Sequence, residues 1–109
     1  MTKNSNIATL VNRVKSDPKD SFSKFALALE LIKTQRNESA IVFFEDIIRN
    51  DPNYIGVYYH LGQQYFLIGD NKKAIAVYNK GIEVATKLKD NHARTELETA
   101  LITLQIETE

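Results

Sequence analysis

The chain contains no cysteine, and no run of eighteen uncharged apolar residues occurs anywhere along it. The absence of cysteine excludes disulfide bonds and thiolate chemistry. Because a long apolar run is absent, no membrane-spanning helix is expected. The N-terminal stretch Met1–Asn6 also lacks the apolar segment of a signal peptide. A cytoplasmic protein is therefore the expectation.

An excess of positive or negative charge is missing as well. Lys plus Arg and Asp plus Glu each number 14, so the formal net charge is zero. A protein that binds the nucleic-acid backbone or anionic lipid usually carries a basic excess. Neither nucleic acid nor a membrane surface is therefore an expected partner. A length of 109 residues suits a single domain over 1–109.

Residues for catalysis and for ligand chemistry are also scarce. The four glycines are scattered, so the chain has no phosphate-binding loop, and the only two histidines, His60 and His92, lie on different predicted helices. His92 with Asp90 and Glu96 is the nearest approach to a metal site, but solvated charges at a helix terminus explain that group equally well. We therefore expect no catalytic residue, no metal and no cofactor.

The two prolines reveal an internal repeat. Lys15-Ser16-Asp17-Pro18 recurs as Arg49-Asn50-Asp51-Pro52. A fixed interval of about 34 residues, such as the one from Pro18 to Pro52, is typical of helix-pair repeats. The same offset relates five pairs of similar apolar or small residues: Leu27 and Leu61, Ala28 and Gly62, Leu31 and Tyr65, Ala40 and Ala74, Phe44 and Tyr78.

Apolar residues at three- and four-residue steps predict helices throughout. The last predicted helix has one apolar face, with Glu96, Thr99 and Thr103 on a side suited to water, which is typical of a cap. Acidic pairs such as Glu45-Asp46 are likewise expected on solvated helix faces. The six predicted helices cover residues 5–15, 19–34, 38–50, 54–68, 71–87 and 89–105.

Three positions depart from the repeat. Gln35 stands where the second copy has Gly69, so the first inter-helix turn is expected to be strained or differently shaped. Lys24 replaces a large apolar residue. Thr86 stands where a third proline would fall, so the fifth helix is expected to run longer.

The run Leu61-Gly62-x-x-Tyr65, followed by Ala74-x-x-x-Tyr78-x-x-Gly81, resembles the tetratricopeptide repeat. Leu27-Ala28-x-x-Leu31, followed by Ala40-x-x-x-Phe44, is a second copy. The resemblance implies an all-α fold: a right-handed superhelical stack of antiparallel helix pairs, an α-solenoid of about six helices. The implied parts are an N-terminal helix over 5–16, repeats over 21–54 and 55–88, and a C-terminal capping helix over 89–106.

The resemblance also implies a non-catalytic scaffold for protein–protein interaction, because the first helix of each pair lines a concave groove in this family. Members that bind acidic chaperone tails carry lysines, arginines and asparagines there. Here Arg94 is the only cation at a matching place, so that activity is disfavoured. The expected partner-binding positions are Phe22, Phe25, Leu29, Tyr59, His60, Gln63, Phe66 and Arg94.

Three arrangements remain open for the apolar and aromatic face that these positions form. Neighbouring helices cover it, or it receives an apolar segment of another protein such as an amphipathic helix, or two copies of the chain meet through it as a homodimer. The sequence does not choose among them.

Overall fold

The computed structural model describes residues 3–108, with side chains from Asn6 onward, so Met1, Thr2 and Glu109 of the expected domain lie outside it. Within the described residues the fold is all-α and contains six helices, as predicted. The helices are α1 (Lys3–Ser16), α2 (Ser21–Lys33), α3 (Asn37–Asn50), α4 (Gly56–Leu67), α5 (Asn71–Leu88) and α6 (Asn91–Glu107).

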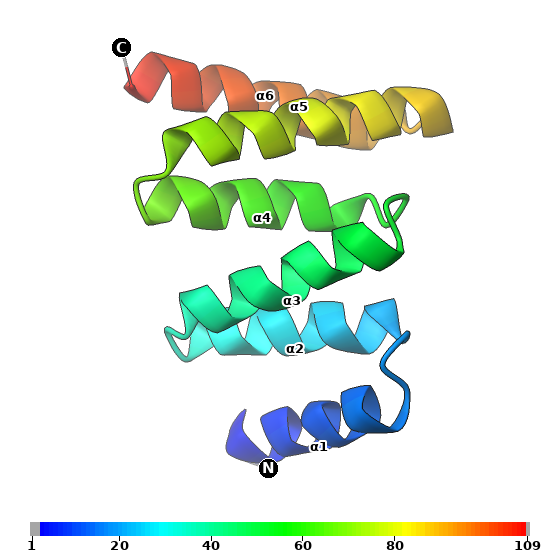
Figure 1. Cartoon of the computed structure of the whole chain (residues 1–109). Coiled ribbons are helices and arrows are strands. Elements are labelled where there is room, and N and C mark those ends of the chain that lie inside the picture. The colour runs from blue at the N-terminus through cyan, green and yellow to red at the C-terminus, as the bar shows by residue number, and fades with distance from the viewer. Residues whose placement is uncertain (1–2, 109) are drawn as a thin grey trace. The chain divides into compact units, whose positions relative to one another are not determined.

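The chain divides into two compact units, Met1–Tyr54 and Ile55–Glu109. In the first unit α2 packs against both α1 and α3, and in the second all three helices pack against one another. Consecutive helices within each unit run antiparallel (Figure 1). Each unit therefore buries its apolar stripes between neighbouring helices.

Aspartate side chains define where three helices begin. Asp20 accepts a hydrogen bond from the Ser23 amide at 3.0 Å, and Asp70 and Asp90 do the same for the amides three residues ahead. Such N-caps satisfy amides that have no partner inside the helix. The helices predicted from residues 19 and 89 consequently begin two residues later, at Ser21 and Asn91.

The Asp-Pro segments form the same turn twice. The Asp20 amide donates to the Asp17 carbonyl at 3.0 Å, and the Tyr54 amide donates to the Asp51 carbonyl at 3.0 Å. Proline cannot donate an amide hydrogen and disfavours helix before it, so α1 and α3 end ahead of these turns. The start predicted at Tyr54 for α4 is wrong by two residues, because Tyr54 belongs to the turn.

Left-handed residues close the turns that follow α2 and α4. Gln35 has φ 62° and Gly69 has φ 86°. In each turn the amide of the following residue donates a hydrogen bond to a carbonyl of the preceding helix, from Arg36 to Leu31 at 2.8 Å and from Asp70 to Tyr65 at 2.9 Å. The two turns therefore share one geometry, and Gln35 carries the strain of a Cβ in the left-handed region.

The second unit shows why small residues occur at the helix crossings. A Cβ built on Gly62 would lie 2.2 Å from Cε1 of Tyr78, and one on Gly81 would lie 2.6 Å from Cβ of Tyr58. Such distances are far inside van der Waals contact, so α4 and α5 approach this closely only because these positions lack side chains. Tyr58 and Tyr78 fill the space on either side and are buried.

Lys24 occupies the position that Tyr58 has in the second copy, and it too is buried. Its ammonium group pairs with Asp46 on α3, which also accepts a hydrogen bond from Arg49 at 3.1 Å. The neighbouring Lys24 ammonium holds the pKa of the Asp46 carboxyl below its ordinary value. The solvated face expected for Asp46 is therefore replaced by a partly buried ion pair.

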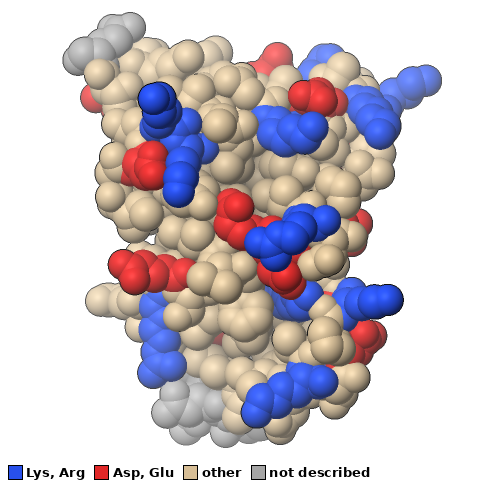
Figure 2. All heavy atoms as spheres, in the orientation of Figure 1, with Lys and Arg blue, Asp and Glu red and all other residues tan. Residues whose placement is uncertain are grey.

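Charged side chains of both signs lie on the surface (Figure 2). Figure 2 shows lysine, arginine, aspartate and glutamate side chains interspersed on the visible face. Over residues 3–108, no helix combines the length and apolarity that crossing a membrane requires. The same residues contain no group of three histidine, aspartate or glutamate side chains arranged to hold a metal ion.

Candidate functional site

A cavity of about 350 Å³ opens on the surface of the second unit between α4 and α6. We call it the α4–α6 pocket. Its volume falls within the range of pockets that hold small ligands or a few side chains. The residues that line it are Tyr59, Gln63, Phe66, Tyr78, Glu96, Thr99, Ala100, Thr103, Leu104 and Glu107.

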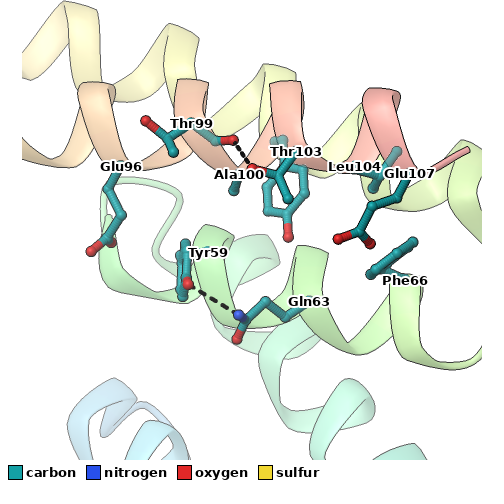
Figure 3. Close-up of a pocket in the computed structure, with 10 residues that line it drawn as sticks. Tyr59, Gln63, Phe66, Glu96, Thr99, Ala100, Thr103, Leu104 and Glu107 are labelled. Carbon is teal, nitrogen blue, oxygen red and sulfur yellow. Dashed lines mark hydrogen bonds between the residues drawn. The ribbon is translucent and has the colours of Figure 1, made fainter.

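One wall comes from α4. Tyr59, Gln63 and Phe66 are spaced by four and three residues, so they lie on one stripe of this helix. The Gln63 side-chain amide donates a hydrogen bond to the Tyr59 hydroxyl at 3.0 Å (Figure 3). This bond orients the Gln63 amide, while the Tyr59 and Phe66 rings supply most of the apolar surface of the wall.

The opposite wall comes from α6. The Thr103 hydroxyl donates to the Thr99 carbonyl at 2.8 Å, so its donor is already engaged within the helix. Figure 3 shows Glu96 and Glu107 at the two ends of this wall, with the small residues between them. The stripe consists of Glu96, Thr99, Ala100, Thr103 and Glu107, which repeat at three- and four-residue steps.

Tyr78 of α5 and Leu104 of α6 are the buried members of the pocket lining. Burial raises the pKa of the Tyr78 phenol to about 12, so the phenol is neutral at pH 7. The pocket therefore combines aromatic and aliphatic surface with a few polar groups at its rim.

The charge of the lining is negative. Two of the ten lining residues, Glu96 and Glu107, carry carboxylates, and none is a lysine or arginine. Within residues 3–108 neither carboxylate lies within 4.0 Å of a cation in an ion pair. His60 interacts electrostatically with Glu96, but burial lowers the pKa of its imidazole, which favours the neutral form.

Three of the eight predicted binding residues, Tyr59, Gln63 and Phe66, line this pocket. His60 lies beside it, with its ring edge-on to the Tyr59 ring at 5.6 Å between centroids. Arg94 is not among the lining residues, and its Nε lies 4.0 Å from a carboxylate oxygen of Glu98. The cation expected in the groove thus has an acidic neighbour on its own helix.

The other three predicted residues belong to α2 of the first unit. Phe22 is 65% exposed, whereas Phe25 and Leu29 are half-buried. The Phe25 ring lies between two aromatic neighbours, with centroids 6.0 Å from Phe44 and 5.4 Å from Tyr54. Phe25 therefore supports the packing of its own unit, and Phe22 is the accessible aromatic group of α2.

Sequence reasoning missed the α6 half of the pocket. It expected Glu96, Thr99 and Thr103 only to face water, and they are indeed exposed, but they also form one wall of a cavity. These three residues lie on one stripe of α6 together with Ala100, and that pattern could have identified the wall. A small residue between exposed polar ones leaves room for a neighbour.

Comparison with known families agrees with this architecture. Sequence profiles described as tetratricopeptide repeat match residues 1–57 and residues 55–88. No curated protein matches the sequence.

Solved structures are also similar to the chain. A tetratricopeptide repeat domain protein from Salinibacter ruber, in its crystal structure, is 36% identical with a TM-score of 0.75, covering 79% of this chain and 96% of that one. Its solution structure is 37% identical with a TM-score of 0.77, covering 82% and 90%. The TPR2B domain in its complex with pHsp70, from yeast Sti1, is 15% identical with a TM-score of 0.85, covering 93% and 81%, and shows the fold alone.

Proposed function

Because the chain belongs to the tetratricopeptide repeat family, whose members are in general protein-interaction modules, we propose that it binds a segment of a partner protein in the α4–α6 pocket. In this proposal the chain is a scaffold and performs no catalysis. The observation that carries it is the aromatic cavity itself. By the resemblance, Phe22, Phe25 and Leu29 on α2, together with His60 and Arg94, are further contact positions.

The composition of the pocket supports a peptide as the occupant. Burying one large apolar side chain contributes about 1.5–3 kcal/mol, and Tyr59 and Phe66 offer aromatic surface for such a side chain. Gln63 provides an amide whose carbonyl oxygen accepts hydrogen bonds from a peptide backbone. A segment that inserts one or two apolar side chains would therefore gain both burial and orientation.

A blocking substitution tests the proposal. Thr103→Trp adds bulk to the α6 wall at an exposed position, so it fills the cavity without entering the core. Gln105→Trp places the same side chain on the same helix at an exposed position that does not line the pocket. Circular dichroism melting curves check that both variants fold.

The readout is a selection of displayed random peptides of twelve residues on the wild-type chain. We expect selected peptides to bind the Gln105→Trp variant as they bind wild type, and to lose at least tenfold in affinity for Thr103→Trp. Equal binding to both variants, or no selected peptide that Thr103→Trp blocks, contradicts the proposal.

A structural homo-oligomer is the second candidate function, and the exposed apolar side chains favour it. Phe22 on α2 is 65% exposed and Leu67 at the end of α4 is 67% exposed. Side chains of this size in water would gain from burial against a second copy. Sedimentation equilibrium at micromolar concentration tests this candidate.

The matched pair of variants for this measurement is Phe22→Glu and Val42→Glu, because Val42 on α3 is 66% exposed. A dimer that Phe22→Glu dissociates and Val42→Glu leaves intact supports self-association through the predicted face. A wild-type monomer at the highest concentration measured removes the candidate.

A further inference from the structure

The carboxylates of the α4–α6 pocket stand at its two ends, separated by eleven residues of α6. From this arrangement we infer that the occupant is an extended segment with an apolar centre and a lysine or arginine on each side. The inference rests on the proposed function, because it specifies the chemistry of the segment bound in the same pocket.

Charge complementarity predicts the sign of the charges on the bound segment. The chain as a whole has net charge zero, yet the pocket lining contains two carboxylates and no cation. Burial lowers the pKa of the His60 imidazole, which favours its neutral form beside Glu96. A basic side chain at each end would therefore meet a carboxylate with no competing ion pair among the described residues, whereas an acidic one would be repelled.

The spacing of the carboxylates gives the spacing of the partner's charges. Eleven residues of helix, at 1.5 Å each, separate Glu96 and Glu107 by about 16 Å along the axis of α6. An extended chain advances about 3.3 Å per residue, so it covers that distance in about five residues. Two basic residues about five positions apart therefore match the two ends of the pocket.

The spacing of the charges also distinguishes an extended from a helical occupant. An extended segment carries its two basic residues about five positions apart, whereas a helix lying along α6 would carry them about eleven positions apart. The cavity of about 350 Å³ has room for a few side chains of either occupant. Selected peptides with basic residues about eleven positions apart would therefore indicate a helix and contradict the extended segment.

The aromatic rings add to the preference for cations. Tyr59 and Phe66 line the same wall of α4, and Figure 3 shows Glu96 opposite Tyr59 and Glu107 opposite Phe66. A lysine or arginine beside either carboxylate would also approach the face of an aromatic ring, which attracts cations. Each end of the pocket therefore pairs a carboxylate with a ring.

The test is the same peptide selection, now carried out on wild type and on three variants. Glu96→Gln and Glu107→Gln each remove one charge of the pocket, and both side chains are exposed, so folding should be unaffected. Glu83→Gln is the matched control, because Glu83 on α5 is exposed and lies outside the pocket lining. Thermal melting monitored by circular dichroism confirms that all three are folded.

We expect peptides selected on wild type to be enriched in pairs of lysine or arginine about five residues apart. Each pocket variant should weaken their binding by about two- to fivefold, as expected for rim charges, and Glu83→Gln should leave it unchanged. Raising the salt concentration should weaken wild-type binding and have less effect on the double variant Glu96→Gln, Glu107→Gln.

Two results overturn the inference, and they differ in what they say of the proposed function. Peptides that Thr103→Trp blocks, but that show no basic enrichment, refute the inference and leave the pocket as a binding site. A selection that yields no peptide blocked by Thr103→Trp refutes the proposed function and the inference together.

Discussion

The left-handed residue between α2 and α3 offers a sharp test of how the repeat distributes strain. Gln35 at φ 62° and Gly69 at φ 86° occupy equivalent turns in the two copies of the repeat. Gln35 is exposed. A Cβ on Gly69 would meet no atom within 4 Å. The exchange Gln35→Gly, with Gly69→Gln as its reverse, therefore isolates backbone conformation from side-chain packing.

The magnitude follows from two opposing terms. The left-handed conformation costs a residue with a Cβ about 1–2 kcal/mol more than glycine. Glycine loses about 0.5–1 kcal/mol more conformational free energy on folding. We expect Gln35→Gly to raise the free energy of unfolding by about 0.5–1 kcal/mol, which raises Tm by about 2–6 °C in a domain of this size. Gly69→Gln should lower the free energy of unfolding by a similar amount.

Urea denaturation followed by circular dichroism at 222 nm measures both variants. The control is Gln35→Ala, which keeps a Cβ in the left-handed region and should change the free energy of unfolding by less than about 0.5 kcal/mol. An unchanged or lower midpoint for Gln35→Gly, with an unchanged m-value, would refute the reasoning. So would a Gly69→Gln variant as stable as wild type.

Three further predictions concern packing and charge. Gly62→Ala should destabilise the second unit by about 2–3 kcal/mol in urea denaturation, because its Cβ would lie 2.2 Å from Tyr78, whereas Ala76→Ser at an exposed site should not. Asp46→Asn should lower the free energy of unfolding by about 1–3 kcal/mol by leaving the buried Lys24 ammonium without its charged partner. Because the pKa of the Asp46 carboxyl is lowered on folding, this carboxylate stabilises the folded state above about pH 4, and the stabilisation is lost as pH falls through the folded pKa. The acid-denaturation profile of Asp46→Asn should lack this pH-dependent loss. The Tyr78 phenol, with a pKa of about 12, should ionise only near pH 12 in the folded chain, as measured by absorbance at 295 nm. The free energy of unfolding should fall above pH 10, because the phenol ionises at lower pH in the unfolded chain. Ionisation of the Tyr78 phenol at pH 10 in the folded chain would contradict its burial.

Much of the fold could be predicted from the spacing of a few residues. The interval between Pro18 and Pro52 located both Asp-Pro turns, and the alignment of Gln35 with Gly69 located the turns after α2 and α4. The missing third proline predicted a longer fifth helix, and α5 continues to Leu88. These features are local, since proline and glycine restrict or free the backbone at their own positions.

The candidate site was less predictable. The α4 stripe of Tyr59, Gln63 and Phe66 was identified through the resemblance, because a first repeat helix has a defined exposed face. The α6 wall was not, since Glu96 and Glu107 at exposed positions have the same pattern whether they face bulk water or a cavity. A sequence pattern reports which face is polar, and it does not report how far the opposite helix stands from that face.

The sequence by itself therefore determined the helices, their order, the turns between them and the small residues at their crossings, because each depends on backbone preferences and on apolar periodicity. Only the tertiary structure decided that Lys24 is buried against Asp46 and that the negatively charged wall of α6 faces the aromatic residues of α4. Both depend on contacts between residues distant in the chain. The distance between two helices is set by the side chains packed around their crossing, and the buried Tyr78 and Leu104 line the pocket between α4 and α6.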